Sequence, residues 1–308
     1  MQRLEAEKTR FNGTVAVFYN PITQIDSREW DSIEEFNGPY HPLLGNYRCD
    51  DPEVLRRQLR WIRRAGIDVI VYDVYGFRKW EITDLPKDRT LPLLVSELAN
   101  QETESRKLQL AIWLEKWFTN PTVEQYQFGL EYVRDQLAKH GFYYRYRGLP
   151  LVLSYENGRN DAFDHVAPKY SDLRLQRVRP FETDVWSYVQ NYPQTLNREW
   201  MPVNPGFDGY LERAYTQKYV ENVKDLDVEA VRRHGPEAAA VREDGRLFER
   251  QLLRARETNP DIIFVSGWND WQCSLQIEPA LEYGFKYVDM TARLLGRSAE
   301  TLPYRRNR

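Results

Sequence analysis

Short runs of β-branched and other apolar residues alternate along the whole chain with longer segments that have the apolar spacing of helices. This alternation predicts βα units and a parallel sheet, because two parallel strands need a crossover between them, usually a helix. The run IDVIVYDVYG at 67–76 is almost entirely apolar, which is typical of a strand that is buried on both faces. We therefore expect an α/β fold in which helices cover a parallel sheet.

Eight segments have the character of strands. They are residues 14–21, 67–76, 108–117, 148–158, 172–181, 184–189, 199–208 and 261–271. Eight strands with interposed helices indicate a (β/α)8 TIM barrel with long βα loops, and 308 residues suit that fold, which uses roughly 250 residues plus insertions. Because no internal repeat or obvious linker interrupts the chain, we expect a single catalytic-type domain over 1–308, with the barrel at about 14–296.

Five segments predict the helices of the outer layer. They are residues 51–66, 91–101, 122–141, 247–260 and 282–296. In the first, Asp51 suits the N-cap, Pro52 the first turn and Gly66 the end of the helix, and the third is expected to end at Gly141. The first helix has its apolar side chains on one face and arginines on the other, which predicts a solvated outer face.

Composition and charge exclude several classes of function. The net charge of -3 argues against a nucleic-acid partner held by phosphate contacts, and no run of about 18 apolar residues predicts a membrane span. The N-terminal residues lack the apolar core of a signal peptide, and two cysteines suit a reduced, cytoplasmic protein, although a removed signal would leave the same composition. Cys49 and Cys273 have no nearby pair of histidines, so we expect neither a metal site nor a cofactor.

The composition is unusual in its aromatic residues, with 9 Trp and 20 Tyr in the chain. Sugar-binding clefts use such rings because the C–H faces of a pyranose stack on them while its hydroxyls form hydrogen bonds. Trp and Tyr also fill ordinary cores. The rings therefore indicate an oligosaccharide or polysaccharide partner only when they lie near suitable polar groups.

The active site of a β/α barrel lies at the C-terminal ends of the strands. Four carboxylates at these ends are the candidate catalytic residues: Asp270, Glu115, Asp73 and Glu156. The candidate substrate-binding residues are Tyr19, Asn20, Tyr47, Tyr75, Trp113, Trp117, Tyr155, Asn204, Asp208, Trp268, Asn269, Trp271, Gln272, Cys273 and Glu278. A glycosidase needs one carboxylic acid to protonate the leaving oxygen and one carboxylate as base or nucleophile.

Each of these residues has an alternative, structural role. A single carboxylate can cap a helix or pair with an arginine, Tyr47 can be structural, and Glu278 can serve to fix its loop. Glu115 is a stronger candidate, because the apolar wall made by Trp113 and Trp117 would raise its pKa and suit it to acid–base chemistry.

The segment after the last predicted strand, SGWNDWQCSLQIEPALEYG at 266–284, resembles the signature of glycoside hydrolase family 99, in which a strand ends Asn-Glu-Trp-His-Glu and continues to Gln-Ile-Glu-Pro. Segments 46–76, 111–117 (AIWLEKW) and 203–208 (VNPGFD) are similar to further blocks of that family, in family order. The resemblance covers about 14–296. It implies a β/α barrel, endo-acting α-mannosidase or α-mannanase activity, and no metal requirement.

The resemblance also implies roles for individual positions. In the family, the first Glu of the motif acts as a base on the sugar 2-hydroxyl, and the Glu three residues later protonates the leaving group. Here Asp270 stands at the first position, Cys273 at the second and Gln272 in place of the His, while Glu115 matches a third-strand carboxylate near the sugar. A thiol with a reference pKa of about 8.5 is a poor substitute for a carboxylic acid at neutral pH, so the implied pair is incomplete.

Three hypotheses of function follow from these residues. The first is a glycoside hydrolase of an α-mannan-like poly- or oligosaccharide, in which Asp270 works with Glu115, Asp73 or Glu156. The second is a catalytically inactive protein that still binds carbohydrate. The third is a transferase or another sugar-modifying protein of a polysaccharide pathway, although no Gly-rich nucleotide loop follows the first predicted strand.

Overall fold

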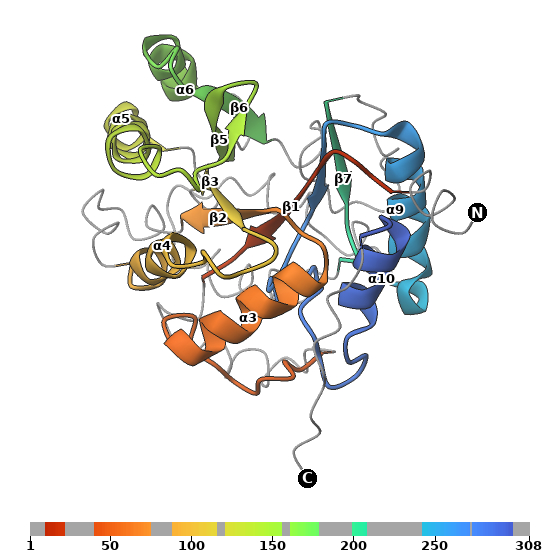
Figure 1. Ribbon diagram of the computed structural model, residues 1–308. Helices are drawn as coiled ribbons and strands as arrows, with labels where there is room; N and C mark the ends of the chain where they lie inside the picture. Colours follow the sequence, from red (N-terminus) through yellow and green to blue (C-terminus); the bar gives the residue numbers. More distant parts are fainter. Residues whose placement is uncertain are drawn as a thin grey trace, which may run out of the picture.

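The computed structural model describes residues 10–21, 40–74, 88–115, 121–155, 161–178, 199–207, 242–271 and 273–297. In this part of the chain a curled sheet lies inside a layer of helices (Figure 1). Helices α3 (Pro52–Arg64), α4 (Thr90–Ala99) and α5 (Val123–Tyr132) lie outside the first strands, and α9 (Arg246–Thr258) and α10 (Lys286–Leu294) lie outside the last ones (Figure 1).

The strands are β1 (Thr14–Tyr19), β2 (Val69–Val74), β3 (Gln109–Leu114), β4 (Arg145–Tyr146), β5 (Leu149–Tyr155), β6 (Arg174–Val178), β7 (Trp200–Val203) and β8 (Ile262–Val265). Parallel pairing runs in the order β6–β5–β3–β2–β1–β8–β7. The first strand of the chain pairs with the last, as in a barrel, and the described strands are interrupted only between β6 and β7. This strand order confirms the predicted (β/α)8 barrel. The strand predicted at 184–189, between β6 and β7, lies outside the described residues.

Helix α3 begins and ends as its sequence predicts. Asp51 accepts hydrogen bonds from the backbone N–H of Glu53 at 2.8 Å and of Val54 at 3.4 Å, and Pro52 occupies the first position of the helix. Gly66 follows with a φ of 77°, and a Cβ there would lie 2.7 Å from the Arg297 side chain. Glycine is therefore required by both its backbone and its close neighbour.

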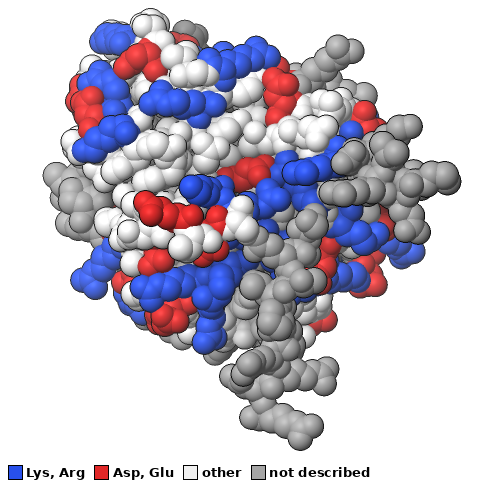
Figure 2. Space-filling view, in the orientation of Figure 1, with Lys and Arg blue, Asp and Glu red and all other residues white. Residues whose placement is uncertain are grey.

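The outer face of α3 is solvated, as its arginines predict. Arg56 is exposed and pairs with Glu53 and Glu97 at 2.7 and 2.9 Å, and Arg57 and Arg60 are exposed as well. On the face of the molecule where α3 and α10 lie, basic and acidic side chains are interspersed (Figure 2). Such a mixture does not form the single-sign surface that nucleic-acid binding uses.

Two local predictions differ from the structure. The helix predicted to end at Gly141 changes after α5 into a π-helical turn, Val133–Leu137, whose last bond runs from the Ala138 N–H to the Val133 carbonyl at 2.7 Å. This wider turn ends the helix before Gly141, which has no left-handed backbone. The hairpin of β4 and β5 was not predicted, and it turns at Arg147 and Gly148, both with positive φ.

The short helical segments α6 (Asp161–Val166), η5 (Ala167–Lys169) and η7 (Glu243–Gly245) complete the described helices. None of the described helices is long and apolar enough to cross a lipid bilayer. The single domain over 1–308 stays a prediction, because 208–241 lies outside the described residues.

Side chains alternate between the two faces of each barrel strand. On β1, Val15, Val17 and Tyr19 pack in the cluster beneath the helices, whereas Ala16 and Phe18 pack in the cluster inside the barrel. The rings of Phe18 and Trp113 meet edge to face with centroids 4.7 Å apart, and Phe18 also lies 5.8 Å from Phe264. The barrel interior is thus a packed apolar core.

Candidate functional site

Continuing the inward face of the strands leads to a group of buried polar residues at their C-terminal ends. These residues are Asn20 after β1, Asp73 near the end of β2, Glu115 after β3, Asn204 after β7 and Ser266 after β8. Asp73 pairs in register with Trp113, and Glu115 follows two residues later on the same face. Carboxylates and amides therefore meet on top of the apolar core, which is where a β/α barrel binds substrate.

The loop after β8 lies over this group and is tied to β1. The Trp268 N–H donates to the Phe18 carbonyl at 2.6 Å. The side chain of Asn269 then forms two hydrogen bonds of 2.8 Å with Asn20, accepting from its backbone N–H and donating to its carbonyl. A Cβ at Gly267 would lie 2.8 Å from the Leu275 carbonyl oxygen, so only glycine lets the two arms of the loop approach this closely.

Asp270 follows this anchor and is 7% exposed. Its Oδ1 accepts a hydrogen bond of 3.2 Å from the Cys273 N–H, and its carbonyl accepts one of 3.0 Å from the Leu275 N–H. Burial raises the pKa of the Asp270 carboxyl to about 6, against the opposing effect of the hydrogen bonds from Cys273. A carboxyl with this pKa is largely ionised at neutral pH and is still basic enough to take up a proton.

Cys273 is 9% exposed and packs with the apolar residues inside the barrel, including Phe18, Trp113 and Phe207. Its backbone N–H supports Asp270, whereas its side chain brings a thiol rather than a carboxyl group to the loop. Cys49 is fully buried, and its Sγ lies 3.8 Å from Asn269 Nδ2. Among the described residues, no three side chains of His, Cys, Asp or Glu are grouped as metal ligands would be.

Glu278 lies behind the loop and has no exposed surface. Its Oε2 accepts hydrogen bonds from the Tyr47 hydroxyl at 2.6 Å and from Trp271 Nε1 at 3.0 Å, and its Oε1 accepts one from Gln58 Nε2 at 2.8 Å. Burial raises the pKa of Glu278 to about 7, although the three hydrogen bonds oppose this shift. The Tyr19 hydroxyl donates to Gln58 Oε1 at 2.7 Å and extends the network to β1.

The sequence pattern of glycosyl hydrolase family 99 matches residues 3–165, which is more than half of the chain. The chain belongs to glycosyl hydrolase family 99. The resemblance found in the sequence is thereby confirmed, and the protein is a glycoside hydrolase-like, carbohydrate-active protein.

Curated relatives of this family 99 protein include two from Mus musculus. A glycoprotein endo-α-1,2-mannosidase-like protein is 22% identical over 80% of this chain and 59% of its own length. A glycoprotein endo-α-1,2-mannosidase is 19% identical over 80% of this chain and 58% of its own length. The chain therefore aligns with less than two thirds of the length of these relatives.

Solved structures show the same fold. A family 99 endo-α-mannosidase from Bacteroides thetaiotaomicron, bound to BIS-TRIS-propane, superposes with a TM-score of 0.64 and 17% identity, and the match covers 91% of this chain and 95% of that one. A glycoside hydrolase-like protein superposes with a TM-score of 0.58 and 14% identity, over 93% and 95% of the two chains. At these identities the likeness establishes the barrel fold.

Within this family 99 barrel, the structure brings most of the described candidates together. Those at the strand ends and on the loop after β8 are Asn20, Asp73, Trp113, Glu115, Asn204, Asn269, Asp270, Trp271 and Cys273. Tyr155 is the last residue of β5. The other candidates, Tyr75, Trp117, Glu156, Asp208 and Gln272, lie outside the described residues.

Direct sugar contact is not supported for three of the candidates. Tyr19 and Trp268 pack in the cluster beneath the helices, and Glu278 lies behind the loop with its carboxyl group committed to Tyr47, Trp271 and Gln58. Tyr19 points toward the helices, where its ring stacks on that of Tyr72 with centroids 5.9 Å apart. Tyr47 is also buried, with its hydroxyl committed to Glu278, and it belongs with Glu278 to the support of the loop.

Three residues that matter to the site were not predicted. Gln58 is a polar residue on the apolar face of α3, three positions after Leu55, and that mismatch is a signal in the sequence. Ser266 directly follows β8, so the position of the strand end could have indicated it. Arg242 donates to the carbonyls of Ser274 and Gln276 at 2.7 and 2.8 Å, and nothing in its polar surroundings in the sequence predicts this contact.

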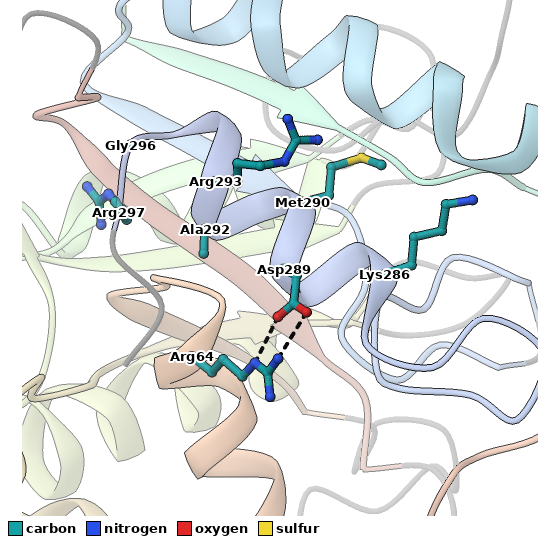
Figure 3. Close-up of a pocket in the computed structure, with 8 residues that line it drawn as sticks. All are labelled: Arg64, Lys286, Asp289, Met290, Ala292, Arg293, Gly296 and Arg297. Carbon is teal, nitrogen blue, oxygen red and sulfur yellow. Dashed lines mark hydrogen bonds and ion pairs between the residues drawn. The ribbon is translucent and has the colours of Figure 1, made fainter. Parts of the chain in front are cut away.

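A pocket of about 680 Å³ lies elsewhere, in the outer layer between α3 and α10 (Figure 3). Its lining residues are Arg64, Lys286, Asp289, Met290, Ala292, Arg293, Gly296 and Arg297. Each of its four cations has a carboxylate partner: Asp289 for Arg64, Asp244 for Lys286, Glu249 for Arg293 and Asp68 for Arg297. With its charges paired and its walls outside the barrel, this pocket is not the candidate active site.

Proposed function

We propose that this protein hydrolyses glycosidic bonds of an α-mannan-like poly- or oligosaccharide at the C-terminal end of its barrel. In this proposal Asp270 is the base, and the second carboxyl group comes from Glu115, Asp73 or Glu156. The choice of sugar rests on the relatives whose names describe them as endo-α-1,2-mannosidases and related proteins.

The carboxyl group of Asp270 is the observation that carries the proposal. It lies on the loop after β8, in the segment 266–284 that resembles the family 99 motif, and burial raises its pKa to about 6. A base works best when its pKa lies near the working pH, and such groups concentrate at functional sites. Asn20 Oδ1, buried beside this loop, has no hydrogen-bond partner among the described residues and is suited to accept a bond from a sugar hydroxyl.

The second carboxyl group would come from a neighbouring strand end. Asp73 lies on β2 and Glu115 directly follows β3, and these two strands are paired, so both carboxyl groups belong to the same part of the barrel mouth. Pairs of catalytic carboxyl groups in glycosidases are separated by roughly 5–9.5 Å. The proposed hydrolysis requires one of these carboxyl groups to lie at such a separation from that of Asp270.

Cys273 favours a second candidate function, carbohydrate binding without hydrolysis. If the resemblance of 266–284 to the family motif holds, Cys273 stands at the position of the acid that protonates the leaving group, and it is a thiol within an apolar cluster. Loss of one positioned acid typically slows a reaction by about 10²–10⁴-fold. A sugar-modifying or transferase activity is the third alternative, and the cytoplasmic location and the lack of a cofactor stay predictions.

The test is the release of reducing ends from a panel of α-mannans and bacterial polysaccharides. We expect release by the parent protein and its loss in Asp270→Asn and Glu115→Gln, whereas Asp135→Asn, at an exposed carboxylate paired with Arg134, retains activity. If the parent protein releases no reducing ends from any glycan of the panel, the hydrolase proposal is wrong for those substrates. Calorimetric binding of an oligosaccharide by such an inactive protein would instead support the carbohydrate-binding function.

A further inference from the structure

A continuous chain of buried hydrogen bonds leads from β1, through helix α3, to the loop that carries Asp270. It begins at the Tyr19 hydroxyl, passes through Gln58 on α3 to Glu278, and ends at the indole Nε1 of Trp271, with donor–acceptor distances of 2.7, 2.8 and 3.0 Å. Trp271 is the residue next to Asp270. The carboxyl group of Glu278 is therefore linked to Tyr19 of β1 through Gln58, and it bonds directly to Trp271, the neighbour of the proposed base.

Asp270 is held in place mainly through its neighbours. On one side, Asn269 is fixed to Asn20 by two hydrogen bonds of 2.8 Å. On the other side, the indole of Trp271 is fixed to Glu278 Oε2 at 3.0 Å and to the Tyr47 hydroxyl at 3.2 Å. The carboxyl of Asp270 itself accepts a hydrogen bond from within its loop, from the Cys273 N–H at 3.2 Å. If Trp271 were released, only one of the two flanking anchors would remain.

We propose that Glu278 is a positioning residue for Asp270 and that it acts through the indole of Trp271. The inference rests on the proposed function, because it takes Asp270 as the base. Glu278 has no exposed surface and touches no sugar in this arrangement. It provides a fixed acceptor that sets the direction of the Trp271 ring and, with it, the backbone from which the Asp270 side chain extends.

A carboxyl group suits this position because three donors converge on it. An ionised carboxylate only accepts hydrogen bonds, and Glu278 accepts from Tyr47 and Trp271 on one oxygen and from Gln58 on the other. In Glu278→Gln, the amide oxygen can still accept from Trp271, while the amide nitrogen faces Gln58, whose own amide then has to turn. The Gln variant thus keeps the bond to the loop, and Glu278→Ala removes it.

The experiment compares Trp271→Phe and Glu278→Ala with Glu278→Gln and with the control Tyr72→Phe. Phenylalanine at 271 keeps an aromatic ring, but it is smaller than the indole and lacks the N–H that Glu278 and the Tyr47 hydroxyl accept. Glu278→Ala, which leaves the indole in place, and Glu278→Gln, which also keeps the bond to it, separate the loss of the hydrogen bond from the loss of ring volume. Tyr72 is a buried tyrosine whose ring stacks on that of Tyr19, and its hydroxyl donates to the Asp88 carboxylate at 2.8 Å and not to Glu278 or Gln58, so phenylalanine keeps the stacking and leaves the chain of hydrogen bonds intact. All four variants are compared with the parent by circular dichroism, so that unfolded proteins are recognised before activity is measured.

The first readout is the pH dependence of kcat and KM for glycan hydrolysis. Misplacement by about 1 Å can slow an enzyme by about 10²-fold, so we expect kcat to fall about 10- to 100-fold in Trp271→Phe and Glu278→Ala, with little change in KM. We also expect the acidic limb of the pH profile, which reports Asp270, to move in these two variants. Glu278→Gln should restore most of kcat, and Tyr72→Phe should match the parent.

The second readout needs no catalytic activity. The rate at which iodoacetamide alkylates Cys273, followed by peptide mass spectrometry, reports the order of the loop, because this thiol is 9% exposed in the intact arrangement. We expect alkylation to accelerate about tenfold in Trp271→Phe and Glu278→Ala and to stay at the parental rate in Glu278→Gln and Tyr72→Phe. If Glu278→Ala does not fold, Trp271→Phe and Glu278→Gln carry the comparison.

Folded Trp271→Phe with parental kcat, pH profile and alkylation rate would overturn the proposal. Equal changes in Trp271→Phe and Tyr72→Phe would also overturn it, because they would show general loosening of the core. If the parent hydrolyses no glycan, the proposed function fails by itself, and the alkylation rates still decide whether Glu278 fixes the loop through Trp271.

Discussion

Asn20 and Asn269 bind each other through two hydrogen bonds of 2.8 Å, although 249 positions separate them in the chain. The Asn269 side chain bonds to both the backbone N–H and the backbone carbonyl of Asn20, directly after β1 has ended and beyond the last paired residue of β8. Buried backbone groups without partners are costly, so this single side chain replaces a piece of sheet. It also fixes the start of the loop on which Asp270 lies.

Replacing Asn269 with alanine should lower the free energy of unfolding by roughly 2 kcal/mol, since two buried backbone groups lose their partner. Urea denaturation measures the difference. The control is Asn100→Ala, because Asn100 is exposed and bonds only to the Ser96 carbonyl of its own helix, and we expect a change within about 0.5 kcal/mol. Equal effects of the two substitutions would show that the hydrogen bonds between Asn20 and Asn269 do not stabilise the protein more than an exposed side-chain hydrogen bond does.

Glu278 should make the stability of the protein depend on pH. Its pKa is about 7 in the folded protein against 4.5 as the ordinary value, so the folded state binds the proton more tightly. The stabilisation by this proton is complete below pH 4.5 and is lost as the pH rises through about 7. The difference between a pKa of 4.5 and one of about 7, at about 1.4 kcal/mol for each pH unit, corresponds to about 3 kcal/mol in the free energy of unfolding.

The glutamine of Glu278→Gln does not titrate, so this variant does not lose the stabilisation by the proton. Its free energy of unfolding relative to the parent should therefore rise by about 3 kcal/mol between pH 4.5 and 7. Denaturation by urea at a series of pH values in this window measures it. Asp270 titrates in both proteins and cancels in the comparison. Parallel curves for the two proteins would contradict the raised pKa of Glu278.

The barrel could be predicted from the sequence because its strands are short apolar runs, and the period of their side chains is simple. The strand-end rule also pointed to Asp73, Glu115 and Asp270, which the structure has at the ends of β2 and β3 and on the loop after β8, while their role in a site stays a prediction. The same rule could not separate Tyr19 from Asn20. Adjacent residues of a strand point to opposite faces, and the face that meets the helices is known only once the register is fixed.

The support of the loop could be predicted only in part. Gln58 interrupts the apolar stripe of α3, and a polar residue there needs a buried partner. The partner itself, Glu278, is 220 positions away, and no local pattern links the two. The aromatic residues of the motif at 268–271 suggested sugar stacking, but burial depends on the whole fold, and it assigns Trp268 to the core.

Arg242 should be among the most sensitive positions outside the mouth. It is buried and donates to the carbonyls of Ser274 and Gln276, which follow Cys273 on the loop. Its guanidinium lies over the rings of Tyr40, Tyr287 and Tyr283 at 4.6, 4.7 and 5.4 Å. Arg242→Ala should lower the free energy of unfolding on the order of 3 kcal/mol, because charged hydrogen bonds and cation–π contacts disappear together.

Arg242→Lys keeps the charge but not the planar group, so it should recover only part of this loss. Arg57→Ala, at an exposed arginine of α3, is the control and should change the free energy of unfolding by less than about 0.5 kcal/mol. Thermal denaturation of the three variants separates these cases. A Lys variant as stable as the parent would show that charge alone holds the loop.

Cys273→Glu should increase glycan hydrolysis if the proposed function holds, since it brings a carboxylic acid to the position that resembles the acid of the family motif. Asp270 can take up a proton near neutral pH, but the thiol beside it is a poor proton donor to a leaving oxygen. The apolar surroundings of Cys273 would raise the pKa of a carboxyl placed there and so favour its protonated form. A positioned acid contributes about 10²–10⁴-fold, which sets the expected gain in kcat/KM.

Cys273→Gln has the size of the Glu variant without its proton, and it should stay at the parental rate. The gain in Cys273→Glu should disappear when Asp270→Asn is added, because the acid then has no base to work with. Initial rates of reducing-end release on one α-mannan measure all four proteins. If Cys273→Gln gained as much as Cys273→Glu, the effect would come from reshaping the apolar cluster around Trp113, and proton donation at position 273 would not be what limits the parent.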